Sequence, residues 1–154
     1  DKGVVFMKRN QWIGVIVVIV MITGVFVYIN LKNRVEIPES IHEMLIDGYE
    51  VKEREYVTAF RDGGDMLFVL GYDSSVYESQ WEHLKQFNVL QLDTSRIKTL
   101  RSMVLPQFKN KVTVEELLRI PDSAIHVFML ENNAYAYFIP LPNNQVAIIF
   151  EKPH

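Results

Sequence analysis

The sequence predicts an α+β domain that follows a single membrane-spanning helix. An uncharged apolar run, WIGVIVVIVMITGVFVYI, covers residues 12–29. Strand-like segments come in two groups, at 49–70 and 124–151, and helical patterns separate the two groups. Runs of consecutive strands interrupted by helices are typical of α+β proteins with an antiparallel sheet.

The apolar run has the length and the borders of a membrane-spanning helix. Its residues, at 1.5 Å each, make a helix of about 27 Å, close to the hydrocarbon thickness of a bilayer. Trp12 and Tyr28 lie where aromatic rings favour the two headgroup levels. Strands rarely run this long, and the run shows no polar alternation. Basic residues flank it on both sides: Lys8, Arg9, Lys32 and Arg34.

A cleavable signal peptide is the main alternative, with Lys8 and Arg9 as its basic region. Ile22 at the minus-three position and the apolar continuation to Ile29 favour a retained anchor. The excess of basic residues before the run favours a cytoplasmic N-terminus. The expected organisation is a short cytoplasmic arm (1–11), a transmembrane helix (12–29), a linker (30–38) and an extracytoplasmic α+β domain (39–154).

Composition excludes several classes of function. The chain has 154 residues and no cysteine, which excludes disulfides, zinc–thiolate sites and cysteine nucleophiles. A formal net charge of −3 does not indicate nucleic-acid binding. These features suit a bacterial cell-surface protein in the cell membrane.

Two capping-box patterns predict helices that flank the first strands. Ser40 with Glu43 predicts a short helix that Gly48 ends. Ser75 with Glu78 predicts a second helix. One face of this helix, which is expected to pack on the sheet, carries Tyr77, Trp81 and Leu84.

Two further helices are predicted in the middle of the chain. Asp93 or Thr94 caps the first, which Pro106 ends. Thr113, with Glu116, begins the second, and Pro121 ends it.

Five strands are predicted, at 49–60, 66–70, 124–131, 134–139 and 145–151. The first two form a hairpin around a turn at 61–65, which contains two glycines. The last three form a meander. Its turns, at 132–133 and 142–144, contain asparagine, which tolerates left-handed backbone geometry.

This order of elements is similar to that of PAS-like and Cache-like sensor domains, which often follow a membrane helix in bacterial receptors. The resemblance rests on topology alone. It implies a closed ligand pocket between the helical middle and the sheet, and it supplies the alternative fold. A solid core with an exposed apolar face would instead favour assembly with a partner.

The residues that most often carry chemistry lack the spacing that chemistry requires. His42 begins an HExxH-like segment, but Ile46 stands where the second zinc ligand belongs. His83 and His126 have no partner nearby in the sequence. An enzyme of unrecognised type would need one of them close to Asp73. We therefore expect no catalytic residues, no metal and no cofactor, and we do not expect an enzyme.

Charge patterning supplies the one candidate binding surface. Acidic residues crowd residues 36–55, whereas a later stretch carries basic residues without an intervening acid. We expect this basic stretch to bind an acidic protein, an anionic polymer or lipid headgroups. The candidate partner-binding residues are Arg96, Lys98, Arg101, Lys109 and Lys111.

The functional expectation is a single-pass, membrane-anchored binding or assembly module, a subunit or accessory factor of a bacterial envelope complex. It would contact membrane lipid and a protein partner, and no nucleic acid. The alternatives are a membrane-tethered ligand-sensing domain and an enzyme of unrecognised type.

Overall fold

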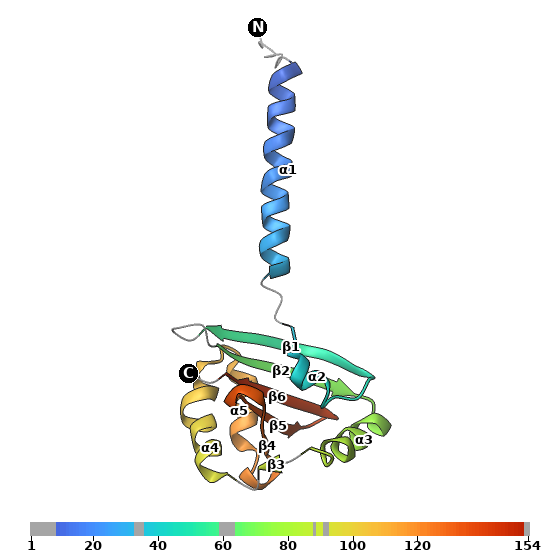
Figure 1. Ribbon diagram of the computed structural model, residues 1–154, viewed down its shortest axis with the longest axis vertical. Coiled ribbons are helices and arrows are strands. Elements are labelled where there is room, and N and C mark those ends of the chain that lie inside the picture. The colour runs from blue at the N-terminus through green and yellow to red at the C-terminus, as the bar shows by residue number, and fades with distance from the viewer. Residues whose placement is uncertain (1–8, 33–35, 59–63, 88, 91–92, 153–154) are drawn as a thin grey trace. The chain divides into compact units, whose positions relative to one another are not determined.

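The computed structural model describes residues 9–32, 36–58, 64–87, 89–90 and 93–152 (Figure 1). The chain divides into two compact units, Asp1–Arg34 and Val35–His154. Among the residues just named, those of the first unit form one long helix, and those of the second form the sheet and the other helices.

The described residues of the first unit form one helix, α1 (Arg9–Lys32), which is three residues longer at each end than the predicted span. Its described side chains cover 14–27, about 21 Å at 1.5 Å per residue, whereas a hydrocarbon core is about 30 Å thick. Among the described residues, no helix combines the length and the apolar character needed to cross a bilayer. The predicted transmembrane helix is therefore not supported by the structure.

The second unit contains the predicted series of short helix, hairpin, helices and meander, together with the strand β3 and the π and 3-10 helices, which were not predicted. It begins with α2 (Glu39–His42), the hairpin strands β1 (Tyr49–Thr58) and β2 (Gly64–Tyr72), and α3 (Ser74–Leu84). The middle contains β3 (Val89–Leu90), α4 (Thr94–Thr99), the π-helix η1 (Leu100–Val104), the 3-10 helix η2 (Leu105–Gln107) and α5 (Lys111–Arg119). The end contains η3 (Asp122–Ala124), β4 (His126–Met129), η4 (Glu131–Asn133), β5 (Tyr135–Leu141) and β6 (Gln145–Glu151).

The strands form one antiparallel sheet in the order β1-β2-β6-β5-β4-β3, which confirms the α+β class (Figure 1). The predicted hairpin and meander are present, and pairing of β2 with β6 joins them into one sheet. In this central pair, Phe68 lies opposite Ile148. The two-residue strand β3 was not predicted because two residues are too few for a periodic signal.

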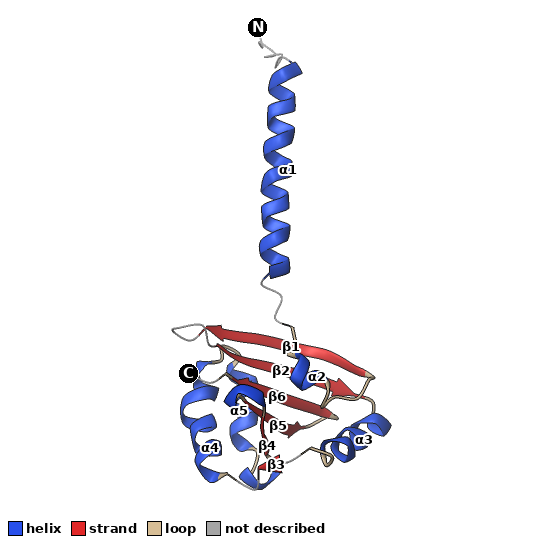
Figure 2. Ribbon diagram, viewed as in Figure 1, coloured by secondary structure: helices blue, strands red, loops and turns tan. Residues whose placement is uncertain are grey.

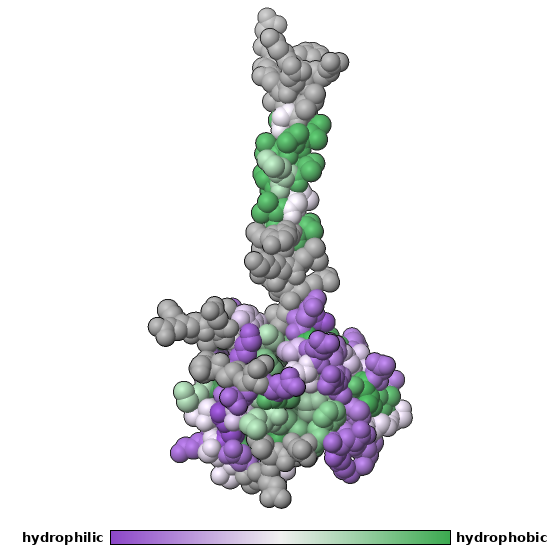
Figure 3. All heavy atoms as spheres, viewed as in Figure 1, coloured by the Kyte–Doolittle hydropathy of each residue, from purple (hydrophilic) through white to green (hydrophobic). Residues whose placement is uncertain are grey.

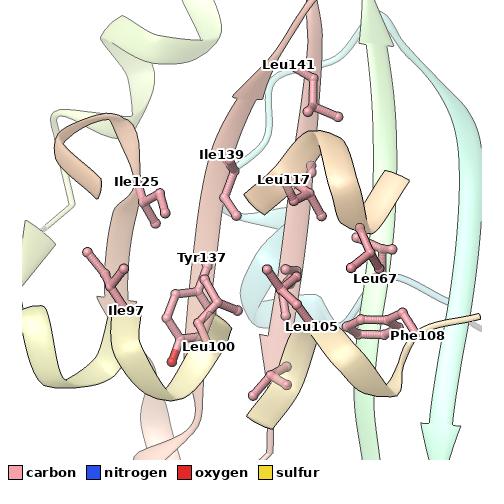
Figure 4. Close-up of a cluster of buried hydrophobic side chains, with 14 of the residues drawn as sticks. Leu67, Ile97, Leu100, Leu105, Phe108, Leu117, Ile125, Tyr137, Ile139 and Leu141 are labelled. Carbon is pink, nitrogen blue, oxygen red and sulfur yellow. The ribbon is translucent and has the colours of Figure 1, made fainter. Parts of the chain in front are cut away.

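Helices cover both faces of the sheet, so its central strands are apolar on both sides (Figure 2). On one face, Leu67 and Ile149 pack with residues of α4, η1, η2 and α5. Figure 4 shows this cluster, in which Leu100, Leu105 and Phe108 are at most 1% exposed.

The alternate residues of the same strands face the second core. Phe68 and Ile148 pack there with Ile41 of α2 and Leu84 of α3. Successive side chains of a strand point to opposite faces, which explains why the central strands are continuous apolar runs. The predicted packing of the Trp81 face on the sheet is confirmed, because Trp81 lies against this core.

Of the N-caps predicted at Ser40, Ser75 and Asp93, only Asp93 is confirmed. Asp93 caps α4, accepting hydrogen bonds of 3.1 Å from the backbone N–H groups of Ser95 and Arg96. These bonds, the one from Arg96 first, lower the pKa of the Asp93 carboxyl. Ser40 and Ser75 instead lie inside their helices, which Pro38 and Asp73 precede without a side-chain cap. Both capping-box predictions were therefore wrong, because the N-cap of each helix lies two residues earlier, at Pro38 and at Asp73.

The other helix boundaries in the middle of the chain differ by a few residues. Asn110, rather than Thr113, caps α5, with its side chain accepting a hydrogen bond from the backbone N–H of Thr113. The predicted end at Pro121 is confirmed. The predicted end at Pro106 is wrong, because α4 ends at Thr99 and Pro106 lies inside the 3-10 helix η2, at a first-turn position where proline is tolerated. The stretch before Pro106 changes from α to π to 3-10 geometry.

The asparagine turns are confirmed. Asn133, Asn143 and Asn144 have φ angles of 60°, 60° and 56°, the left-handed region that asparagine tolerates. Gly48 has a φ of 97°, but it follows α2 by several residues because α2 ends at His42. Of the predicted turn at 61–65, residues 61–63 lie outside the described residues.

Candidate binding groove

An open hollow of about 460 Å³ lies between α2, the segment after α3 and the end of β4. Residues 39–44, 87 and 128–131 meet here although the sequence separates them widely. The lining residues are Glu39, Ser40, Glu43, Met44, Phe87, Phe128, Met129, Leu130 and Glu131. We call this hollow the acidic groove.

The floor of the acidic groove is the outer layer of the second core. Met44 and Phe128 are each 2% exposed, and Phe87 and Leu130 pack against the same cluster. Met129, at the rim, is 54% exposed. An apolar floor that opens to the surface offers a place for an apolar side chain of another molecule.

The rim of the acidic groove is negatively charged. Glu39, Glu43 and Glu131 are exposed, and none of them forms an ion pair with another described residue. No lysine or arginine lies among the lining residues. The three carboxylates therefore favour a positively charged occupant.

A buried glutamine fixes the α2 wall of the acidic groove. Gln80, on α3, is fully buried and donates a hydrogen bond of 2.8 Å from Nε2 to the backbone oxygen of Met44. Its Oε1 accepts hydrogen bonds from the backbone N–H of Ile46 and from the Tyr72 hydroxyl, both 3.0 Å. His83 adds a contact of 3.2 Å between Nε2 and the backbone oxygen of Glu43. The wall is therefore held in place by α3 and β2.

The predicted basic residues are largely engaged within the domain. Arg96 forms an ion pair of 3.3 Å with Glu151 and lies 3.8 Å above the ring of Tyr135. Lys111 donates from Nζ to the backbone oxygens of Pro106, inside η2, and of Phe108, directly after it.

Arg101 joins the π-helix to the end of α5. Its guanidinium donates to the backbone oxygens of Leu118 and Ile120 and to the carboxylate of Asp122. Lys98 and Lys109 are exposed, and their side chains have no partner among the described residues. The five basic residues thus divide into three with structural contacts and two that remain available.

Two acidic residues of the crowded stretch 36–55 also form contacts within the domain. On β1, Glu55 accepts hydrogen bonds from the backbone N–H groups of Lys109 and Asn110, and Glu53 accepts one of 2.8 Å from Thr113 Oγ1. Both carboxylates therefore hold the start of α5 against the sheet.

A buried carboxylate at the end of β6 forms a second polar cluster. Glu151 is 7% exposed, and its Oε2 accepts a hydrogen bond of 2.5 Å from the hydroxyl of the fully buried Tyr137. Burial, and then the bond and charge of Glu151, raise the pKa of Tyr137, against the opposing charge of Arg96. Burial, and then the proximity of Tyr49, raise the pKa of Tyr72.

The two buried tyrosines are expected to make the fold sensitive to alkali. Above the ordinary tyrosine pKa of about 10, the unfolded chain releases phenolic protons that the native state retains. Their contribution to stability is therefore complete below about pH 10 and is lost as the pH rises, by up to about 1.4 kcal/mol per pH unit for each tyrosine. Urea unfolding between about pH 9 and about pH 11 measures this slope.

Matched variants identify which tyrosines carry the slope. Tyr72→Phe and Tyr137→Phe should each flatten the alkaline profile, whereas Tyr56→Phe, at a residue 41% exposed, should leave it unchanged. Equal slopes in all three variants would contradict the assignment.

The histidines considered for catalysis do not form a reactive group with Asp73 among the described contacts. His126 stacks on Trp81, with ring centroids 5.1 Å apart, and its buried Nδ1 has no hydrogen-bond partner among the described residues. His42 Nδ1 lies 3.4 Å from the Tyr49 hydroxyl. Asp73 precedes α3 at an exposed position. Within the described part of the chain, no three histidine or carboxylate residues gather as a metal site.

Sequence reasoning did not find the acidic groove. Two signals were present: Glu39 and Glu43 have the four-residue spacing that places side chains on one helix face, and the charged Glu131 directly follows the apolar strand end at Met129 and Leu130. Neither signal shows that residues near 40 and near 130 meet.

No protein-family model matches this chain, and no curated protein and no solved structure matches it significantly. The fold and the groove therefore define the class on their own: an α+β domain with helices on both faces of an antiparallel sheet and an acidic, apolar-floored groove.

Proposed function

We propose that this protein is a membrane-tethered binding module, a subunit or accessory factor of a bacterial envelope complex, whose α+β domain is extracytoplasmic. The observation that carries the proposal is the surface of α1. The described apolar side chains between Val15 and Val27 are 38–66% exposed (Figure 3).

A helix that is apolar on every side requires apolar surroundings. Each such side chain gains roughly 1.5–3 kcal/mol when it leaves water completely. The sequence extends the apolar run beyond the described side chains, over residues 12–29, which supports lipid as the surroundings.

The filled interior of the domain favours binding over ligand sensing. A sensor of the PAS-like or Cache-like kind needs a closed pocket between the helical middle and the sheet. At that place Leu100, Leu105, Phe108 and Leu117 are at most 1% exposed and occupy the space (Figure 4). The acidic groove, in contrast, opens at the surface, where a partner has access.

Carbonate extraction of cell membranes tests the tether. The full chain with a C-terminal epitope is expected in the membrane pellet after washing at high pH. Ile19→Arg with Val20→Arg should move the chain toward the soluble fraction, because each arginine costs about 2.5–3.5 kcal/mol at the centre of a membrane helix. The control Val112→Arg, at a residue 70% exposed in the domain, should stay in the pellet. Recovery of the unaltered chain in the soluble fraction, or without its first two dozen residues, would overturn the proposal.

The absence of cysteine makes the orientation measurable. Lys98→Cys introduces a single thiol at an exposed position. A membrane-impermeant maleimide should label it in intact cells to the same extent as in permeabilised cells. Labelling only after permeabilisation would place the domain in the cytoplasm.

A further inference from the structure

We infer that the acidic groove binds a peptide segment of a partner protein that carries lysine or arginine beside bulky apolar side chains. This inference rests on the proposed binding function and names the chemistry of the partner. The geometry supplies three arguments, from the floor, the rim and the rigidity of the groove.

The floor calls for apolar side chains. Met44, Phe87, Phe128 and Leu130 line it, and the volume of about 460 Å³ lies within the range of about 300–1,000 Å³ typical of binding pockets. Met44 and Met129 have flexible, polarizable side chains, which adapt to differing apolar partners. A purely hydrophilic polycation would leave this floor uncovered.

The charge of the rim favours a peptide with several positively charged side chains along its length. Glu39 comes from α2, Glu43 from the segment that follows it and Glu131 from η4, on the other side of the groove. One small cation is matched by one carboxylate, whereas carboxylates on opposite sides complement a segment with several cationic groups. The same charges repel anionic lipid headgroups and acidic peptides.

The α2 wall of the acidic groove is preorganised in the unbound protein. The contacts of Gln80 and His83 with the backbone of Met44, Ile46 and Glu43 hold the α2 segment in place. In a preorganised groove, binding carries a smaller entropy cost, because fewer groups must be ordered when the peptide binds. This rigidity suits recognition of a peptide by a fixed surface.

Fluorescence anisotropy with a defined peptide tests the inference. The protein is the full chain in nanodiscs of zwitterionic lipid, and the probe is a fluorescein-labelled peptide of alternating lysine and leucine, with empty nanodiscs as the blank. We expect saturable binding that weakens when sodium chloride is raised from about 50 to about 500 mM. Peptides that alternate lysine with serine, or glutamate with leucine, should bind at least about tenfold more weakly.

Charge reversal in the groove locates the binding. Glu43→Lys with Glu131→Lys should weaken binding of the lysine–leucine peptide by about tenfold or more. The matched controls Glu78→Lys and Glu116→Lys, at exposed acids outside the groove lining, should leave it unchanged. Thermal unfolding of each variant establishes that the domain is folded.

Several outcomes would overturn the inference. Equal binding of the lysine–serine peptide would remove the role of the floor, and equal binding by the groove variant would place the peptide elsewhere. Displacement of the peptide by spermidine at equal concentration would identify a small polycation as the occupant. Self-association that the groove variant abolishes would identify a second copy of the chain. Carbonate extraction does not depend on the groove, so failure of peptide binding with a retained tether refutes this inference alone.

Discussion

Arg101→Met is expected to lower the free energy of unfolding by about 2–3 kcal/mol. The guanidinium donates 2.7 Å to the backbone oxygen of Leu118 and 2.9 Å and 2.7 Å to Asp122, and it also donates to the backbone oxygen of Ile120. These bonds attach the end of α5 to the π-helix. Methionine keeps the apolar stem but leaves the part-buried carbonyl of Ile120 and the exposed carbonyl of Leu118 without their donor. Urea unfolding of the full chain in a mild detergent measures the loss.

Two controls separate these contacts from charge alone. Arg101→Lys keeps the positive charge but not the planar fork, so we expect it to restore only a minor part of the loss. Lys98→Met removes a neighbouring exposed charge and should change stability by less than about 0.5 kcal/mol. If the Arg101→Met protein is as stable as the unaltered chain, these contacts do not stabilise the fold, and Arg101 remains a candidate partner-binding residue, as the sequence indicated.

Arg96 and Arg101 show why the basic stretch was hard to interpret from sequence. Charge patterning identifies a cluster of cations but not the positions of their partners. The acceptors of Arg101 lie 17 to 21 residues later, and Glu151 lies 55 residues after Arg96. Only the folded sheet and helices bring these groups together. Arg96 and Arg101, which were predicted to bind a partner, therefore form contacts within the domain instead.

The strands were predictable because their signal is local. The central strands are apolar on both faces, and the turns carry asparagines whose left-handed geometry the structure confirms. Pairing of β2 with β6 was not predictable, because it joins residues about 80 positions apart and depends on which apolar faces the helices cover. The acidic groove depends on the same long-range arrangement.

The end of β5 was harder to predict, because proline usually marks the end of a strand but is tolerated where the strand has a single neighbour. The third meander strand was predicted correctly at 145–151, whereas the second was predicted to end at Ile139, directly before Pro140, which cannot donate to a ladder. In the structure β5 continues to Leu141. At Pro140 it pairs only with β6, since β4 pairs with β5 no further than Phe138. Proline is tolerated where a strand has one neighbour.

Glu151→Ala is expected to lower the free energy of unfolding by about 3–4 kcal/mol. The carboxylate accepts from the hydroxyl of Tyr137, which is fully buried, and pairs with Arg96, whose side chain is 28% exposed. Alanine leaves the hydroxyl without an acceptor and a half-buried guanidinium without its counter-charge. Glu151→Gln keeps an acceptor for the hydroxyl, so its loss should be about half as large.

A double-mutant cycle determines how much of this loss belongs to the bond with Tyr137. Tyr137→Phe alone should cost about 1–2 kcal/mol, because one carboxylate oxygen loses its donor in a buried place. In the Tyr137→Phe background, Glu151→Ala no longer leaves a buried hydroxyl unpaired. The double variant should therefore lose about 1–2 kcal/mol less free energy of unfolding than the two single variants lose together. Strictly additive losses would contradict a coupled pair and would attribute the effect of Glu151 to Arg96 alone. Since Tyr137 faces the helical core and Arg96 covers Tyr135 at the same end of the sheet, the cycle measures how the last strand holds the α4 layer in place.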